Sequence, residues 1–211
     1  MVGDDEDLVE RSRLRPSWFQ AQPAVMFKFR FDGRPLESLH ALDRDGRVIY
    51  VGTFSKVLLP TLRLGFLVAP ANVMPALKVA KRLSDSHGTI ELQRALADFL
   101  SEGLFARHVK RLHRLYGERR EALHAAAEEH LSRWLAPVPS VTGLHVTFVA
   151  TKPVDDEAWA ERARAKGVEV EALSPYCLEA PQTGLVAGFG LLTPAQIREG
   201  LALIASVAPK K

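Results

Sequence analysis

The sequence predicts an α/β protein that ends in a second, smaller α/β or α+β part. Three observations predict this fold class. Two apolar strands flank a polar turn between residues 47 and 68, apolar residues recur at helical spacing from 90 to 131, and strands alternate with helices after Pro137. Of the 211 residues, 47% are hydrophobic and 25% are charged, which is an ordinary globular composition. We therefore expect a folded protein with one or two cores.

Composition and charge exclude several classes of protein. The chain has 28 basic and 25 acidic residues, an excess too small to indicate nucleic-acid binding by itself. Cys177 is the only cysteine, so no disulfide forms within the chain and a reducing cytoplasm is the expected location. No stretch approaches the roughly 20 apolar residues of a membrane span. The acidic start at 1–7 also differs from the basic start of a signal peptide.

The N-terminal part is expected to supply strands and turns. Residues 1–24 have neither helical nor strand periodicity, so we expect a loose segment there. The stretch 25–31 is typical of a strand, and turn residues at 32–35 end it. A strand at 48–51 then leads into the polar sequence Gly-Thr-Phe-Ser-Lys, and a second apolar strand is predicted at 62–68.

Helices are expected next, and a mixed C-terminal part follows them. Apolar spacing predicts a helix over 73–83 and a longer helical stretch over 90–131 with a break near Gly103. After these we expect strands at 145–150, 168–173 and 184–190, and helices at 155–165 and 197–207. Thr193 is positioned to cap the last helix, Pro194 suits its first position, and Gln196 completes a capping box.

The polar turn before the second strand contains residues suited to one kind of chemistry. An aldehyde cofactor needs an amine for a Schiff base, and its phosphate needs hydroxyl donors and a guanidinium. Lys56 offers the amine, Thr53 and Ser55 offer the hydroxyls, and Arg63 offers the guanidinium. From spacing alone, a solvated turn lysine is the favoured interpretation, because Ser-Lys turns are common.

The segment YVGTFSKVLLPTLRLGFLVAP resembles the lysine segment of class I and II aminotransferases of fold type I, and most closely that of MocR-type regulators in the GntR superfamily. The segments FRFDGRPLESLHALDRDGRVIYVGTFSK, LQRALADFLSEGLFARHVKRLHRLYGERREAL and LTPAQIREGLALIASV also resemble that group, so similarity runs from about Phe29 to Val207. The resemblance implies pyridoxal 5'-phosphate as cofactor, with Lys56 as the Schiff-base lysine. It also implies that Thr53, Ser55 and Arg63 contact the phosphate.

In the family, a winged helix-turn-helix domain precedes an aminotransferase-like domain that dimerises. The resemblance implies the C-terminal part of the fold-type-I large domain plus a small α/β (α+β) domain. The resulting assignment is 1–24 as a segment outside the family, 25–105 as a remnant of the large domain, 106–135 as a connecting long helix and 136–211 as the small domain. We expect an amino acid or amine as ligand, a homodimer, and neither membrane nor direct nucleic-acid contact by these residues.

The sequence departs from the family pattern in three places. Residues 23–28 lack the aspartate and the tyrosine that contact the cofactor ring in relatives, and the earlier half of the large domain is missing. Val186 stands where many aminotransferases place an arginine that binds the substrate carboxylate. The simplest expectation is a truncated product in which residues before about Phe29 are foreign to the fold. The alternative is a minimal protein that completes itself by dimerising.

Three functions follow from this resemblance. The first is an aminotransferase, in which the freed Lys56 acts as general base in a 1,3-proton shift. The second is an effector domain that binds the cofactor or its amino-acid adduct without turnover. The third is an inactive fragment with an exposed sheet edge.

Other polar side chains were weighed as sites. A basic run from 107 to 120 allows a nucleic-acid face, but its helical spacing favours the solvated side of an amphipathic helix. The opposite side would carry Leu112, Leu115 and Leu123. His108 and His113 are five residues apart, which is wrong for a metal pair on one helix face, so we assign no metal. For His145, a packed polar side chain and a site residue both stay open.

Overall fold

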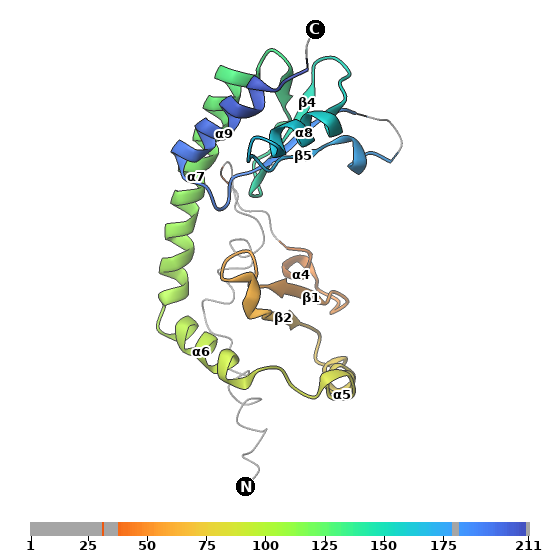
Figure 1. Ribbon diagram of the computed structural model, residues 1–211. Helices are drawn as coiled ribbons and strands as arrows, with labels where there is room; N and C mark the ends of the chain where they lie inside the picture. Colours follow the sequence, from red (N-terminus) through yellow and green to blue (C-terminus); the bar gives the residue numbers. More distant parts are fainter. Residues whose placement is uncertain (1–30, 32–37, 179–181, 210–211) are drawn as a thin grey trace. The chain divides into compact units, whose positions relative to one another are not determined.

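The computed structural model describes residue 31, residues 38–178 and residues 182–209 (Figure 1). The chain divides into two compact units. Unit 1 comprises residues 1–28 and 34–109, and unit 2 comprises residues 29–33 and 110–211. The loose segment predicted at 1–24 and the turn predicted at 32–35 lie outside the described residues, as does the predicted strand 25–31 apart from Phe31.

In the part of unit 1 that the structure describes, an antiparallel strand pair is accompanied by helices. Its elements are α4 (Leu39–Leu42), β1 (Tyr50–Thr53), the 3-10 helix η1 (Pro60–Leu62), β2 (Gly65–Val68), α5 (Met74–Asp85) and α6 (Ile90–Ser101). In the pairing of β1 with β2, Tyr50 lies opposite Val68 and Thr53 lies opposite Gly65. A Cβ atom on Gly65 would lie 2.8 Å from the carbonyl oxygen of Gly52, so the close approach of the strands requires glycine at position 65.

The two strands of unit 1 differ in extent from the prediction. The predicted strand 48–51 is shifted, because β1 begins at Tyr50 and continues to Thr53. The predicted strand 62–68 is wrong for its first three residues. Pro60 starts a short 3-10 helix, and Arg63 ends it in the left-handed region with a φ of 51°. The leucines around Arg63 resemble a strand in sequence, but proline fixes the turn ahead of them.

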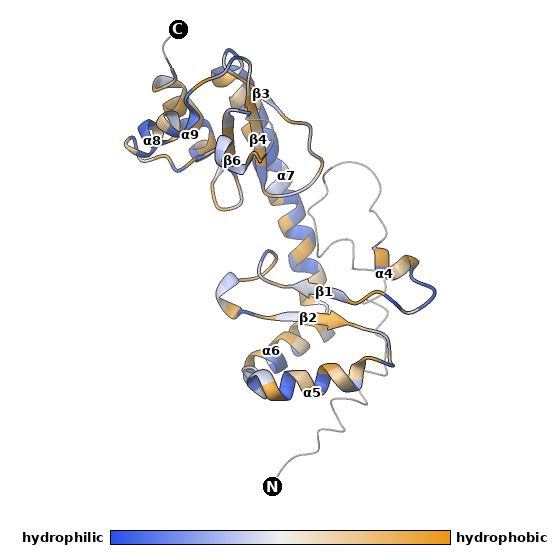
Figure 2. Cartoon of the chain, turned by 90° about the vertical axis from the view of Figure 1, so that its right-hand side faces the viewer, coloured by the Kyte–Doolittle hydropathy of each residue, from blue (hydrophilic) through white to orange (hydrophobic). Residues whose placement is uncertain are grey.

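The core of unit 1 is small and aromatic. Phe54, Val57 and Phe105 are buried, and the ring of Phe54 lies 5.9 Å from that of Phe105 in an edge contact. By contrast, α5 and α6 have no buried residue. Figure 2 shows both blue and orange stretches along α5, and Leu83 in this helix is exposed. Unit 1 therefore keeps apolar side chains of its helices on its surface.

The described residues of unit 2 form a four-stranded antiparallel sheet and three helices. Helix α7 (Leu104–Leu131) begins in unit 1, and its residues from Lys110 onward belong to unit 2. The other elements are β3 (Leu135–Pro137), β4 (His145–Ala150), α8 (Asp156–Arg164), β5 (Glu171–Ala172), the 3-10 helix η2 (Ser174–Tyr176), β6 (Gly184–Gly188) and α9 (Pro194–Ser206). The strand order in the sheet is β3-β4-β6-β5.

The core of unit 2 is centred on Trp159 in α8. This side chain is fully buried, and its indole Nε1 donates a hydrogen bond of 3.0 Å to the Ile204 carbonyl in α9. Strands β4 and β6 contribute the buried side chains of Phe148 and Leu185. Helix α9 begins as predicted, because Thr193 and Gln196 form the capping box. Strands β4 and β6 approach each other closely at Gly184, since a Cβ atom there would lie 2.0 Å from the Phe148 carbonyl oxygen.

A buried carboxylate joins α8 to the sheet. Asp156 is 2% exposed, and its oxygens accept hydrogen bonds from the backbone N–H groups of Leu173, Ser174 and Gly184 at 3.2, 2.9 and 2.9 Å. The Ser174 hydroxyl donates a fourth bond of 2.7 Å. Burial raises the pKa of this carboxyl, but the hydrogen bonds from Ser174 and Gly184 outweigh burial and leave the pKa lower than 3.8.

These bonds explain why the strand predicted at 168–173 is mostly wrong. The Ser174 N–H turns toward Asp156, and the Leu173 N–H is shared between Asp156 at 3.2 Å and the Gly184 carbonyl at 3.0 Å. β5 therefore ends at Ala172 and η2 follows. At the other end, the Val168 N–H donates to the Ala163 carbonyl and closes the end of α8. In between, Glu171 and Ala172 form the ladder pairs with β6.

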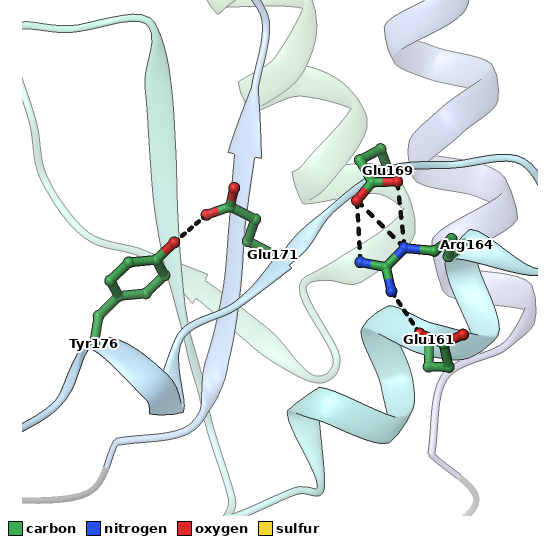
Figure 3. A network of polar contacts seen from close by, with 5 residues as sticks. All are labelled: Glu161, Arg164, Glu169, Glu171 and Tyr176. Atoms are coloured by element: carbon green, nitrogen blue, oxygen red, sulfur yellow. Dashed lines mark hydrogen bonds and ion pairs between the residues drawn. The ribbon is translucent and has the colours of Figure 1, made fainter.

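An exposed ion network lies beside this region (Figure 3). The Arg164 guanidinium contacts Glu161 at 2.6 Å and Glu169 at 3.0 Å, and the Tyr176 hydroxyl donates to the Glu171 carboxylate. All of these side chains are exposed, so we expect the pairs to contribute little to stability.

Candidate functional site

The connection between β1 and β2 holds the predicted cofactor residues. At the end of β1, the Thr53 hydroxyl donates to the Ser55 hydroxyl at 3.0 Å, and the Ser55 N–H donates to the Thr53 Oγ1 at 3.1 Å. The structure thus brings these two predicted residues together. Two hydroxyl groups this close form a paired donor set at one strand end.

Lys56 lies in the single turn that follows the hydroxyl pair. The Val57 and Leu58 N–H groups both donate to the Phe54 carbonyl, at 3.0 and 2.7 Å, and the Phe54 N–H donates to the Leu64 carbonyl at 3.1 Å. Phe54 and Val57 are buried, whereas Lys56 between them is exposed. The apolar residues therefore anchor the turn, and the lysine side chain stays available.

Arg63 lies at the far end of the same connection. It ends η1 in the left-handed conformation, two residues before β2 begins, and its side chain is exposed. The structure thus places all four predicted residues on one connection of unit 1 and joins Thr53 to Ser55 by a hydrogen bond. An amine, two hydroxyls and a guanidinium are the groups that an aldehyde with a phosphate would need. The role of each residue remains a prediction.

Sequence reasoning missed one residue next to this turn. The Nε2 atom of His108, in α7, lies 2.8 Å from the Val57 carbonyl oxygen. A carbonyl oxygen only accepts, so the proton of this bond is on Nε2. In the sequence, His108 belongs to the basic run and is unsuited to form a metal pair with His113. It also lies three residues after the apolar Phe105 on the same helix face, and a polar residue on such a face is a usable signal.

The basic run of α7 divides into two parts. Arg107, Lys110, Arg111 and Arg114 are exposed as predicted, while Leu123 is buried and Leu112 and Leu115 are half-buried. The prediction of a solvated side is wrong for Arg119 and Arg120. These side chains are half-buried, and their guanidinium groups donate to the carbonyls of Gly190 and Ser140. They hold loops of unit 2.

The remaining candidates lie elsewhere. Val186 is half-buried in β6, where it pairs with Thr147 of β4 and Glu171 of β5. His145 is exposed at the start of β4, so its packed alternative is wrong and its use as a site residue stays open. Among the described residues, no group of three or more His, Cys, Asp or Glu could hold a metal ion. In the same residues, no helix is both long and apolar enough to cross a membrane.

Comparisons with known proteins match most of the chain. The family model for aminotransferase class I and II matches residues 25–201, which begins before the Phe29 where we placed the start of the similarity. A probable rhizopine catabolism regulatory protein, MocR, from Rhizobium meliloti is 38% identical over 82% of this chain and 36% of its own length. Aromatic-amino-acid aminotransferase 1 from Thermococcus litoralis is 29% identical over 84% of this chain and 43% of its own length.

Solved structures give the same picture. The kynurenine aminotransferase of Pyrococcus horikoshii superposes with a TM-score of 0.74 and 26% identity, over 87% of this chain and 45% of that one. An α-aminoadipate aminotransferase of Thermus thermophilus, solved with N-(5'-phosphopyridoxyl)-L-leucine, gives a TM-score of 0.74 and 27% identity over 84% of this chain and 46% of that one. The resemblance and fold class predicted from the lysine segment are confirmed, and the chain spans less than half the length of these relatives.

Proposed function

Since this chain belongs to the aminotransferase class I and II family, we propose that its lysine turn binds pyridoxal 5'-phosphate, with Lys56 as the residue of covalent attachment. The chain is an aminotransferase-like domain homologous both to MocR-type regulators and to aminotransferases. The proposal concerns what these residues contribute to a protein whose relatives are more than twice as long.

The arrangement of the β1 to β2 connection supports the proposal most directly. The hydroxyls of Thr53 and Ser55 lie 3.0 Å apart, next to the exposed Lys56, and Arg63 follows before β2. This donor set fits the cofactor. Hydroxyls and a guanidinium bind phosphate oxygens through charge-assisted hydrogen bonds, and an exposed amine can attack an aldehyde. When bound, the cofactor supplies an electron-withdrawing ring that stabilises negative charge on a carbon next to the amine.

We propose amino-group transfer between an amino acid and a 2-oxo acid as the reaction. In it, the Lys56 amine would hold the cofactor and, when free, would act as the general base that moves a proton between two carbon atoms. The aminotransferases among the relatives support this reaction. A homodimer in a reducing cytoplasm, with a small amino acid or amine as ligand, completes the proposal.

A second function is cofactor sensing without turnover. Two observations favour it. Several relatives are transcriptional regulators, including the pyridoxine biosynthesis regulator PdxR of Corynebacterium glutamicum at 32% identity. In addition, the apolar Val186 occupies the strand position where the family resemblance implies a carboxylate-binding arginine. In this function ligand binding would shift a conformational equilibrium. DNA contact would then come from a domain other than this one.

The proposal is tested by absorbance spectroscopy of the full chain with added pyridoxal phosphate, beside Lys56→Ala and a matched Lys78→Ala control. Lys78 is also exposed but lies in α5. We expect an absorbance band that the free cofactor does not show. The Lys78→Ala variant should retain this band, and the Lys56→Ala variant should lose it. Borohydride reduction and mass mapping should then find the adduct on Lys56.

The outcomes separate the three functions. A Lys56-dependent band with turnover of an amino acid and a keto acid supports the aminotransferase. The same band without turnover supports the sensor. An adduct spread evenly over the surface lysines would refute the proposal and favour the inactive fragment.

A further inference from the structure

The Val57 carbonyl lies at the end of the lysine turn, where the turn itself gives it no N–H partner. The Phe54 carbonyl accepts from Val57 and Leu58, but the turn ends there because Leu59 is extended, with φ −79° and ψ 127°. The Val57 carbonyl therefore has no N–H one helical turn ahead of it. A buried carbonyl without a partner costs free energy, so the fold must satisfy it from elsewhere.

His108 supplies that partner from a distant part of the chain. Its Nε2–H donates to the Val57 carbonyl at 2.8 Å, across a sequence separation of 51 residues. The imidazole is half-buried, and its ring makes an edge contact with Phe99 of α6 at 6.2 Å. These contacts hold the donor in one orientation toward the turn.

The same face of α7 makes a second contact with the lysine turn. Phe105 lies one helical turn before His108, and its ring contacts that of Phe54 at 5.9 Å. The two contacts thus hold residues 54 and 57, and Lys56 lies between them. The apolar contact between the two rings sets the distance of the turn from α7 but allows the peptide groups of the turn to rotate. A hydrogen bond to a carbonyl is directional. The bond from His108 therefore holds the Val57–Leu58 peptide at its carbonyl, while the Leu58 N–H of the same peptide is held by the Phe54 carbonyl.

We propose that His108 is a positioning residue for Lys56, which it acts on through the Val57 carbonyl. This inference rests on the proposed cofactor attachment at Lys56. Without the bond, the turn keeps its ring contact and its bonds to the Phe54 carbonyl, but the Val57–Leu58 peptide is held at its N–H alone. The turn that carries Lys56 is then less restrained, so the amine samples more directions. The loss of one hydrogen bond corresponds to a change of about threefold to tenfold in an equilibrium.

The test compares His108→Leu, which removes the donor, with His108→Gln, whose side-chain amide can still donate to the carbonyl. His87→Leu is the matched control, because His87 is exposed between α5 and α6. Two measurements are made on the full chain. Hydrogen exchange without cofactor reports on the amides of residues 54–58, and borohydride trapping at graded pyridoxal phosphate reports the apparent dissociation constant at Lys56.

We expect His108→Leu to raise exchange at the Val57 and Leu58 amides about threefold to tenfold and to weaken trapping at Lys56 by a similar factor. His108→Gln should restore both values, and His87→Leu should change neither. If the parent chain shows no attachment at Lys56, the proposed function fails. The exchange measurement still reports whether the hydrogen bond from His108 to the Val57 carbonyl restrains the turn. Unchanged exchange in His108→Leu, no rescue by His108→Gln, or exchange raised across all of unit 1 would each overturn the positioning role.

Discussion

The two units of this protein bury their apolar residues to different extents. Unit 2 encloses Trp159 completely, and α8 and α9 both contribute buried side chains. In unit 1, neither α5 nor α6 buries a residue, and Leu83 is 82% exposed. Folding stability should therefore be concentrated in unit 2, while the core of unit 1 is limited to the surroundings of the lysine turn. Four substitutions test this difference.

The largest effect is expected from Trp159→Ala in unit 2. The substitution removes a fully buried indole and its bond to Ile204, so the free energy of unfolding should fall by about 3–5 kcal/mol. Denaturant unfolding followed by circular dichroism measures this loss. Glu157→Ala, an exposed change in the same helix, is the control and should cost little. Equal losses in the two variants would contradict the assignment of the core to Trp159.

Asp156→Asn should follow, with a loss of about 2–3 kcal/mol at neutral pH, because an amide nitrogen replaces an oxygen that accepts from backbone N–H groups. The parent should also depend on pH. Its carboxyl pKa is lower in the folded state than 3.8, so the carboxylate stabilises the fold above that pH and loses this contribution as the pH falls through the folded-state pKa.

Unfolding curves at a series of acidic pH values measure this dependence, which the Asn variant should lack. Asp155→Asn is a close control. Asp155 caps α8 by accepting from the Ala158 N–H at 2.9 Å, and asparagine caps equally well. A similar loss in both variants would show that charge at the start of α8 matters more than the buried bonds of Asp156.

In unit 1, Val57→Ala should cost about 1.5 kcal/mol, because it removes two methyl groups from a side chain that is 3% exposed. Hydrogen exchange should rise around the lysine turn and stay unchanged in the strands of unit 2. Val51→Ala makes the same chemical change at a position that is 70% exposed and should cost far less. Matching losses would mean that the turn has no core of its own.

The smallest effect on stability is expected from Leu83→Gln in α5, within about 0.5 kcal/mol, because this side chain is already exposed. The variant should instead self-associate less, as measured by light scattering over a concentration series. Arg82→Gln, next to it, changes an exposed residue without removing apolar surface. A large loss of stability in Leu83→Gln would show that α5 is packed.

The sequence predicted features that depend on neighbouring residues. The break near Gly103 is confirmed, because α6 ends at Ser101, α7 starts at Leu104 and Gly103 has a φ of 71°. The capping box at Thr193 is confirmed for the same local reason. The fold class rested on the resemblance of the lysine segment and is confirmed as well. The domain boundaries and the roles of Lys56, Thr53, Ser55 and Arg63 stay predictions.

Features that depend on distant residues were missed. The strand predicted at 168–173 has only two residues, and the Ser174 N–H beyond it donates to Asp156, which lies in another element. The edge strand β3 and the short helix α4 were not predicted, since each is too short to show a period. The bond from His108 to Val57 joins residues 51 positions apart, and spacing along the chain does not reveal such a contact.

The close approach of two strands at Gly184 limits which residues homologous sequences can have at this position. A Cβ atom there would lie 2.0 Å from the Phe148 carbonyl oxygen, so no side chain fits while β4 and β6 keep their spacing. This restriction comes from backbone distance and is independent of any ligand. A homologue with a larger residue at the aligned position must have shifted one of the two strands. The residue aligned with position 184 therefore indicates whether a homologue keeps the spacing of β4 and β6.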